Sequence, residues 1–151
     1  MLASLTDLCP TQILMMKTTT TRKILHIDDD ADDHELLRKA IYSIDSASEI
    51  IEATDGADGI ERLNLMKATN DLPCLIVLDI NMPKVNGRDA CVQIKKDRDL
   101  AAIPMIIFST SNSKLDKLFF ETKNVEYITK PTDYDVLVSL ASRMLGQCQT
   151  A

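Results

Sequence analysis

The stretch LIVLDINMP, residues 75–83, runs four apolar residues directly into an aspartate, and a proline follows four positions after that aspartate. A short apolar run that ends in a turn signal is typical of a strand buried on both faces of a parallel sheet. Ligands of such sheets bind beyond the carboxyl ends of the strands. Asp79 therefore occupies a position where a functional side chain is expected.

On both sides of this stretch, short β-rich runs alternate with helical patterns. The predicted strands are KILHI (23–27), EIIEAT (49–54), CLIVL (74–78), PMIIF (104–108) and VEYIT (125–129), and the predicted helices cover 32–44, 57–68, 87–97, 113–122 and 133–145. This alternation predicts a parallel sheet with right-handed crossovers and helices on both faces. The run EIIEA is the more polar one, so we expect it at an edge of the sheet.

The first and last predicted helices carry apolar stripes that we expect to face the core. The stripes consist of Leu36, Leu37, Ala40, Ile41 and Ile44 in the first helix, and of Val136, Leu137, Leu140, Met144 and Leu145 in the last. His26 interrupts the first strand, and we interpret it as a hydrogen-bonded structural residue rather than a ligand.

Composition and charge exclude several classes of protein. The chain has 151 residues, 45% hydrophobic and 26% charged, which fits one ordinary globular domain. Asp and Glu outnumber Lys and Arg by 23 to 17 without a long basic run, so direct binding to nucleic acid is not expected. No apolar run approaches the roughly 18 residues of a membrane span, and no signal peptide is recognisable. We expect a cytoplasmic protein without a membrane partner.

The four cysteines stand at positions 9, 74, 91 and 148, and no two of them form a C-x-x-C pair. Such spacing gives no sign of a zinc site or a redox dithiol. We therefore interpret all four as reduced cytosolic thiols.

Three segments are expected along the chain. Residues 1–22 show no sustained period and are predicted to be a flexible N-terminal leader, residues 23–147 form the folded domain, and 148–151 are a tail. Met15 and Met16 lie just ahead of the first strand, so either is a possible translation start besides Met1. A second, output domain is not expected.

Polar side chains follow four of the predicted strands. They are Asp28, Asp29 and Asp30 after the first, Asp79 after the third, Ser109, Thr110 and Ser111 after the fourth, and Lys130 with Pro131 after the fifth. Each group alone has an ordinary explanation as a helix cap, a favourable helix N-terminus or a turn. Their joint occurrence predicts a site in which acids, a hydroxyl and a lysine converge.

The runs ILHIDDD, LIVLDINMPKVNG, IPMIIFSTS and YITKP stand in the order and spacing of response-regulator receiver domains of two-component signalling, and the chain resembles that family over about Lys23–Leu145. The absence of further chain resembles the stand-alone, single-domain members. The resemblance implies a flavodoxin-like (βα)5 fold, a doubly wound five-stranded parallel sheet of order 2-1-3-4-5. In that order Asp28, Asp29 and Asp79 would lie side by side.

By this resemblance Asp79 is the phosphoacceptor, a carboxylate nucleophile that forms an aspartyl-phosphate. The implied cofactor is Mg²⁺, or Mn²⁺ in its place, since crowded carboxylates repel one another and such ions prefer oxygen ligands. Its implied protein ligands are Asp28, Asp29, Asp79 and the backbone carbonyl of Asn81.

The resemblance also assigns residues around the phosphoryl group. Ser109 and Lys130 would bind the phosphoryl oxygens, and Tyr127 would be the aromatic side chain that rotates on switching. A cis bond before Pro131 would aim Lys130 at the acids.

Two further residues complete the expectations around the site. Gly87 is expected to allow a tight turn with positive φ ahead of the third helix. Asp30 has no role that we can assign.

The family resemblance implies a signalling switch rather than an enzyme. Asp79 would take phosphate from a phosphohistidine on a sensor histidine kinase or a histidine phosphotransfer protein, and the chain would catalyse only its own phosphoryl transfer and autodephosphorylation. A downstream protein target would bind the face formed by the fourth helix, fifth strand and fifth helix.

Two alternatives remain open. The first is a phosphohydrolase with an aspartyl nucleophile, but such enzymes need a second Asp two residues later as general acid, where this chain has Asn81. The second is a receiver-like adaptor that no longer accepts phosphate. Such domains usually lose an acid or the lysine, and this chain keeps both.

Overall fold

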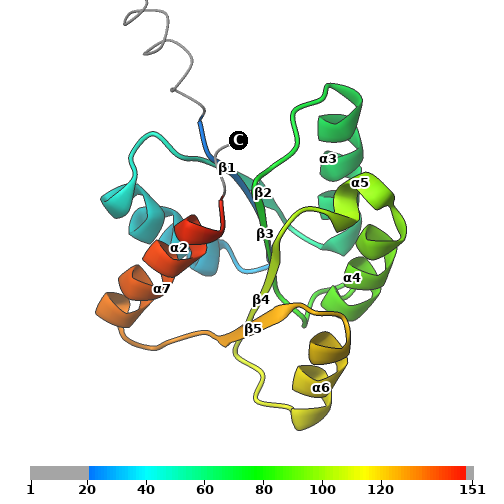
Figure 1. The fold of residues 1–151 in the computed structure, drawn as a ribbon. Helices are drawn as coiled ribbons and strands as arrows, with labels where there is room; N and C mark the ends of the chain where they lie inside the picture. Colours follow the sequence, from blue (N-terminus) through cyan, green and yellow to red (C-terminus); the bar gives the residue numbers. More distant parts are fainter. Residues whose placement is uncertain (1–20, 149–151) are drawn as a thin grey trace, which may run out of the picture.

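The computed structural model describes residues 21–148, which form a five-stranded parallel sheet with helices on both faces (Figure 1). The strands are β1 (Lys23–Ile27), β2 (Glu49–Ala53), β3 (Leu75–Leu78), β4 (Met105–Ser109) and β5 (Glu126–Thr129). Their order, β2-β1-β3-β4-β5, confirms the predicted order and the edge position of EIIEA. Most of the predicted leader (1–20) and the last three residues of the predicted tail lie outside the described residues.

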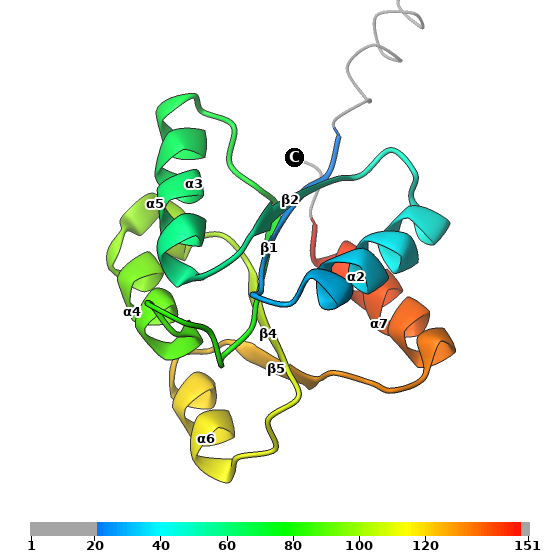
Figure 2. The same ribbon diagram turned by 180° about the vertical axis from the view of Figure 1, so that it is seen from behind.

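The helices are α2 (Ala31–Ile44), α3 (Gly56–Ala68), α4 (Gly87–Lys96), α5 (Arg98–Ala101), α6 (Lys114–Thr122) and α7 (Tyr134–Gln147). Helices α2 and α7 cover one face of the sheet, and α3, α4 and α6 cover the other (Figures 1 and 2). All five predicted helices are present within two residues of their expected bounds. The short α5 was not predicted. It arises because the Asp97 side chain accepts hydrogen bonds from the backbone N–H groups of Asp99 and Leu100, which starts a new helical turn.

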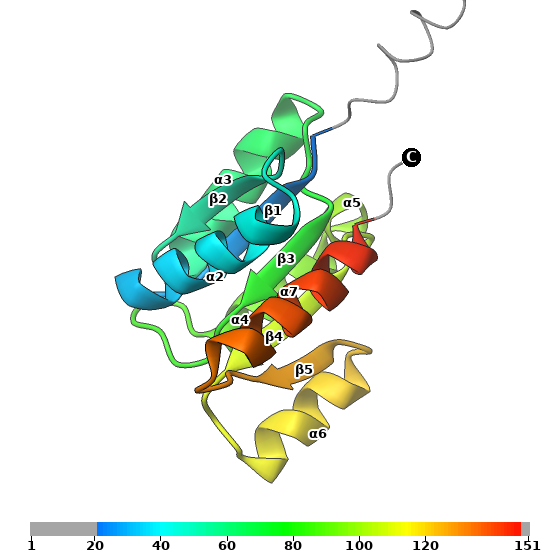
Figure 3. The same ribbon diagram turned by 90° about the vertical axis from the view of Figure 1, so that its left-hand side faces the viewer.

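The sheet lies between two layers of helices (Figure 3), and a cluster of apolar side chains fills the space on each face. The side chains under α2 and α7 include Leu37, Ile41, Leu137 and Met144, and those under α3, α4 and α6 include Leu63, Ile94 and Phe120. The central strand β3 is buried along its whole length, as its apolar sequence predicts.

Fewer residues of the predicted apolar stripes are buried in the structure than the sequence predicted. Leu36, Ile44 and Val136 were expected to face the core, but they are 45%, 41% and 48% exposed. In α2 only His34, Leu37, Ala40 and Ile41 are buried, because residues three and four apart share the face that meets the sheet and α7. Positions at the margins of the stripe face solvent.

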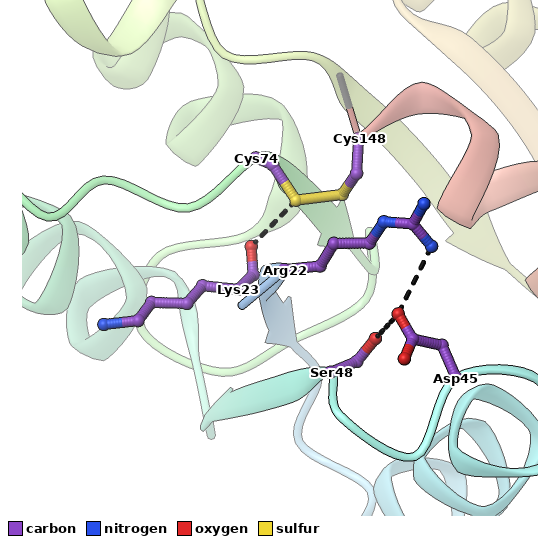
Figure 4. The surroundings of a disulfide bond; sticks show 6 residues. All are labelled: Arg22, Lys23, Asp45, Ser48, Cys74 and Cys148. Carbon is purple, nitrogen blue, oxygen red and sulfur yellow. Dashed lines mark hydrogen bonds and ion pairs between the residues drawn. A yellow bond between two sulfur atoms is a disulfide. The ribbon is translucent and has the colours of Figure 1, made fainter. Parts of the chain in front are cut away.

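Cys74 and Cys148 form a disulfide with 4.9 Å between their Cα atoms, so the prediction of reduced thiols is wrong for these two residues (Figure 4). The bond joins the chain just before β3 to the end of α7. A sequence separation of 74 residues concealed this proximity, which arises when α7 packs back across the sheet. Cys91 is free and buried, and Cys9 lies outside the described residues.

Both ends of the described domain are tied to the sheet. Arg22 pairs with Asp45 at 3.2 Å (Figure 4). The backbone carbonyl of Arg22 accepts from the N–H of Glu49 at 2.8 Å. The folded domain therefore begins at or before Arg22 rather than at Lys23, and Cys148 belongs to the fold rather than to a tail. Across residues 21–148, no helix is both long and apolar enough to cross a membrane.

Candidate functional site

The pairing of β1 with β3 brings two acids together at the carboxyl ends of the strands. Ile27 pairs with Leu78, and the Asp79 N–H donates to the Ile27 carbonyl at 3.0 Å, so Asp28 and Asp79 leave the sheet side by side. Carboxylate oxygens of Asp28, Asp29 and Asp79 all lie within 4.8 Å of one another. Asp28 and Asp79 are buried, whereas Asp29 is exposed.

Asp28 stays ionised in this crowded setting. Burial by itself raises the pKa of its carboxyl, but the nearby ring of His26 and hydrogen bonds from Lys130 and the backbone N–H of Asp30 outweigh burial and bring the pKa to about 2. The Asp30 N–H donates to Oδ1 at 3.0 Å, and Nζ of Lys130 donates to Oδ2 at 2.7 Å.

Asp79 is shifted in the opposite direction. Burial raises the pKa of its carboxyl above the ordinary value, and the negative charge of Asp28 raises it further, against the opposing effects of Lys130, the Ile80 N–H and Ser109. The Ile80 N–H donates to Oδ1 at 2.8 Å, and Nζ of Lys130 lies 3.6 Å from Oδ2. The two neighbouring acids thus have pKa values pushed apart, an arrangement found at reactive sites.

Lys130 reaches the acids from the end of β5. Its backbone N–H donates to the Ser109 carbonyl at 2.8 Å, which continues the pairing of β4 with β5 for one more residue. Burial alone would lower the pKa of Lys130, but its bonds to Asp28 and Asp33 raise it well above the ordinary value. The ammonium is therefore charged throughout the physiological range.

The peptide bond before Pro131 is trans, so the prediction of a cis bond is wrong. Trans is the ordinary state of an X-Pro bond. Here the backbone bond to β4 and the ion pairs of Nζ direct Lys130 towards the acids.

Two acids have roles that the sequence did not reveal. Asp30 is the N-cap of α2, and its carboxylate accepts from the backbone N–H groups of Asp32 and Asp33. The carboxylate of Asp33 accepts a second bond from Nζ of Lys130 at 2.7 Å. Acids on a first helical turn are common because they suit the helix dipole. Nothing in the sequence therefore distinguished Asp33 from its neighbours.

Ser109 and Tyr127 are connected through the loop that follows β4. The hydroxyl of Ser109 is fully buried and accepts from the Ser111 N–H at 3.2 Å. Tyr127, half-buried on β5, donates its hydroxyl to the Ser111 carbonyl at 2.6 Å. The structure thus places both predicted switch residues against the same loop, whereas their roles in switching stay predictions.

Gly87 is the first residue of α4, and its N–H donates to the Ile80 carbonyl at 2.9 Å. The predicted positive φ is wrong: no glycine of residues 21–148 has positive φ, and Lys84 in the preceding loop has φ 62° instead. A Cβ at Gly87 would lie 2.3 Å from the backbone oxygen of Asp79. Glycine is needed here for close approach to the site.

Asn81 lies exposed two residues after Asp79 in the loop that follows β3. Its role as a metal ligand through the backbone carbonyl stays a prediction.

His26 and His34 form a buried pair beneath the acids, with ring centroids 4.4 Å apart. Nε2 of His34 lies 2.7 Å from the backbone oxygen of Asp28, and Nε2 of His26 lies 3.7 Å from Oδ2 of the same residue. Burial lowers the pKa of His26. Within the described residues neither ring nitrogen of His26 has a hydrogen-bond partner, so the expected hydrogen-bonded role is not realised.

The three acids fit a divalent cation such as Mg²⁺ or Mn²⁺. Their donor atoms are all carboxylate oxygens within 4.8 Å of one another, the ligand type that these ions prefer. Burial and the negative charge of Asp28 both disfavour the charged form of Asp79. A cation would offset both effects.

Comparisons with known proteins point to one family. The family model for the response regulator receiver domain matches residues 24–142. Protein PilH of Pseudomonas aeruginosa is 31% identical over 99 residues, covering 65% of this chain and 78% of PilH. Sensor histidine kinase CheAY of Helicobacter pylori is 29% identical over 123 residues. The match covers 81% of this chain but only 15% of the length of CheAY.

Solved structures agree with the sequence matches. The phosphorylated cyanobacterial phytochrome response regulator RcpA superposes with a TM-score of 0.78 at 28% identity, covering 85% of this chain and 94% of that one. The Mn²⁺-bound form of response regulator Rcp1 gives a TM-score of 0.72 at 26% identity, covering 86% and 96%.

Proposed function

Because the chain belongs to the response regulator receiver domain family, we propose that it accepts a phosphoryl group on Asp79 in a two-component or phosphorelay system. The donor is a phosphohistidine on a sensor histidine kinase or a histidine phosphotransfer protein. One observation carries the proposal: Asp79 lies among three clustered carboxylates and 3.6 Å from the ammonium of Lys130. The similarity to phosphorylated RcpA supports it.

The residues of the site have complementary roles in this transfer. A carboxylate oxygen of Asp79 attacks phosphorus, the bond from phosphorus to the histidine nitrogen breaks, and the imidazole leaves with the electron pair of that bond. Lys130 and Ser109 donate to the phosphoryl oxygens, on which negative charge is spread during transfer. Lys130 opposes the raised pKa of Asp79 and so favours the carboxylate form that attacks.

Asp28, Asp29 and Asp79, with the backbone carbonyl of Asn81, would hold a Mg²⁺ or Mn²⁺ ion. When bound, the ion supplies positive charge against the phosphoryl oxygens, which is what phosphoryl transfer requires from its site. The similarity to the Mn²⁺-bound Rcp1 structure supports this assignment.

In this proposal the chain is a substrate of phosphotransfer and catalyses only its own phosphorylation and autodephosphorylation. Asn81, two residues after Asp79, offers an amide in place of the second acid that a phosphohydrolase needs. The acids and the lysine are all present and in contact, which supports phosphate acceptance over the adaptor alternative.

The proposed surface for a downstream protein is the α6–β5–α7 face. Its three elements are the fourth helix, fifth strand and fifth helix that were predicted from the sequence. Leu115 and Leu118 of α6 are 74% and 57% exposed, and Tyr134 of α7 is 44% exposed. Large exposed apolar side chains on a surface are typical of protein-binding sites. Tyr127 belongs to this face through β5, and its hydroxyl donates to the Ser111 carbonyl in the loop after β4.

Intact-mass spectrometry after incubation with acetyl phosphate tests the proposal. We expect a single phosphoryl adduct that requires Mg²⁺ or Mn²⁺, disappears in Asp79→Asn and persists in the control Asp89→Asn, which removes an exposed acid of α4. An adduct on Asp79→Asn, or full labelling in EDTA, would contradict the assignment.

A further inference from the structure

Lys130 is held by two carboxylates at equal distance, and one of them lies outside the acidic cluster. Its Nζ atom is 2.7 Å from Oδ2 of Asp28 and 2.7 Å from Oδ2 of Asp33, but 3.6 Å from Oδ2 of Asp79. The side chains of Lys130 and Asp33 are 9% and 29% exposed, so this ion pair is largely shielded from solvent. The ammonium is therefore drawn away from the residue that accepts phosphate.

Asp28 and Asp33 differ in what else can neutralise them. Asp28 belongs to the three carboxylates that gather within 4.8 Å, and a cation in that cluster competes with Lys130 for its oxygens. Asp33 stands on the first turn of α2 outside the cluster, and its contact with Lys130 is not in competition with the cation. When the cluster is occupied, Asp33 is thus the remaining anchor that opposes Asp79.

The backbone of Lys130 is fixed, whereas its side chain can move between acceptors. The backbone N–H bonds to the Ser109 carbonyl at 2.8 Å, and Nζ lies 5.9 Å from the centre of the Phe108 ring. The four-carbon stem is flexible, and an ammonium on it interacts as a point charge with any carboxylate in reach. A new charged group on Asp79 must therefore attract Nζ from a bond that already exists.

We propose that Asp33 is a positioning residue that restrains Lys130 away from Asp79 and so lowers the affinity of the site for a phosphoryl group. This inference rests on the proposed function of Asp79. Asp33 touches neither the phosphoryl group nor the cation in this proposal, and it acts only through Lys130. Part of the energy that Lys130 gains by binding the phosphoryl group is spent on breaking its ion pair with the Asp33 carboxylate.

Beryllofluoride, a phosphoryl mimic, provides the test at a fixed, saturating Mg²⁺ concentration. We expect Asp33→Asn to bind beryllofluoride about three- to tenfold more tightly than the wild type, because a shielded ion pair no longer has to be broken. Asp32→Asn is the matched control: it removes an exposed acid from the same helical turn and should change affinity less than about twofold. Asp33→Glu restores a carboxylate and should return affinity towards the wild-type value.

A second readout follows Lys130 itself, first in the wild type and then in Asp33→Asn. In ¹⁵N-lysine-labelled wild-type protein with Mg²⁺, the Nζ signal should have the slow proton exchange of a shielded ion pair. It should shift when beryllofluoride is added. In Asp33→Asn this signal should already resemble the beryllofluoride-bound state before the mimic is added.

Failure of this inference and failure of the proposed function give different results. If the wild type binds beryllofluoride but Asp33→Asn binds it equally or more weakly, the restraint by Asp33 is refuted and the proposed function stands. If Mg²⁺ alone abolishes the ion-pair signature of Lys130, the restraint is refuted as well. If the wild type takes up no beryllofluoride, the proposed function and this inference both fall.

Discussion

Nζ of Lys130 lies 3.6 Å from Oδ2 of Asp79, close enough for strong electrostatic attraction but beyond hydrogen-bonding distance. The backbone of Lys130 is fixed by β4, so this separation depends on the side chains that compete for the ammonium. The charge state of Asp79 follows from the same competition.

Lys130→Gln should raise the pKa of Asp79 further. Burial already raises this pKa, and the variant removes Lys130, whose charge opposes burial. A ¹³C NMR titration of the carboxyl group without metal measures the shift, with Lys84→Gln as a control that removes an exposed loop lysine. An unchanged Asp79 titration in Lys130→Gln would show that the charge of the lysine does not affect the pKa of Asp79.

Asp28 should contribute stability that is lost in acid. Its folded-state pKa of about 2 lies below the ordinary value of 3.8, so its interactions stabilise the fold fully above pH 3.8 and are lost as pH falls through about 2. The shift corresponds to about 2 kcal/mol. Urea unfolding of wild type and Asp28→Asn should show a gap in unfolding free energy at pH 6 that narrows by that amount near pH 2. A gap independent of pH would contradict this account.

Gly87→Ala should destabilise the domain by about 2 kcal/mol, because overpacking against fixed backbone cannot be relieved cheaply. The added Cβ would lie 2.3 Å from the backbone oxygen of Asp79 and 2.7 Å from Cα of Ile80. Gly146→Ala is the control, since Gly146 is exposed on α7 with nothing within 4 Å, and it should stabilise by about 0.5–1 kcal/mol. Equal effects of both changes on urea unfolding would refute the close contact.

Reduction of the Cys74–Cys148 disulfide should lower the unfolding free energy by about 2–4 kcal/mol, because it releases a cross-link in the unfolded chain. Cys74 lines an open cleft of about 410 Å³ near the end of α7, so a reductant can reach the bond. Thermal melts with and without a phosphine reductant measure the effect. The double variant Cys74→Ser, Cys148→Ser should have a lower melting temperature than the wild type, and the reductant should not change it. A wild-type melting temperature that the reductant does not change would argue against the disulfide.

Ser109→Ala should still accept phosphate on Asp79, but it should lose most of the distant response to phosphorylation. Ser109 and Tyr127 both bond to Ser111, so a shift of the Ser109 hydroxyl towards the phosphoryl group changes the loop that holds Tyr127. NMR with beryllofluoride should show wild-type chemical-shift changes across Lys114–Glu121 and at Tyr127. If Ser109→Ala keeps these distant changes, or the wild type lacks them, the coupling runs by another route.

Much of the fold is readable from the sequence because local signals and burial agree. Strand β3 is uniformly apolar and lies at the centre of the sheet, whereas the polar β2 lies at its edge. The acids after β1 and β3 meet because parallel neighbours end at the same side of the sheet. Strand order and the roles expected within the site came from the family resemblance. The structure confirms the strand order, whereas the roles stay predictions.

Other features depended on contacts between residues far apart in the chain. Asp33 is one acid among several on the first turn of α2. Only the tertiary fold brings it to Lys130, which follows β5 and lies 97 residues away in the sequence. Cys74 and Cys148 likewise meet only when α7 returns across the sheet. Periodicity and strand-end chemistry are properties of neighbouring residues, so the sequence by itself determined the layers and the acidic site. Partner choice among similar side chains depends on distances that only the tertiary structure decided.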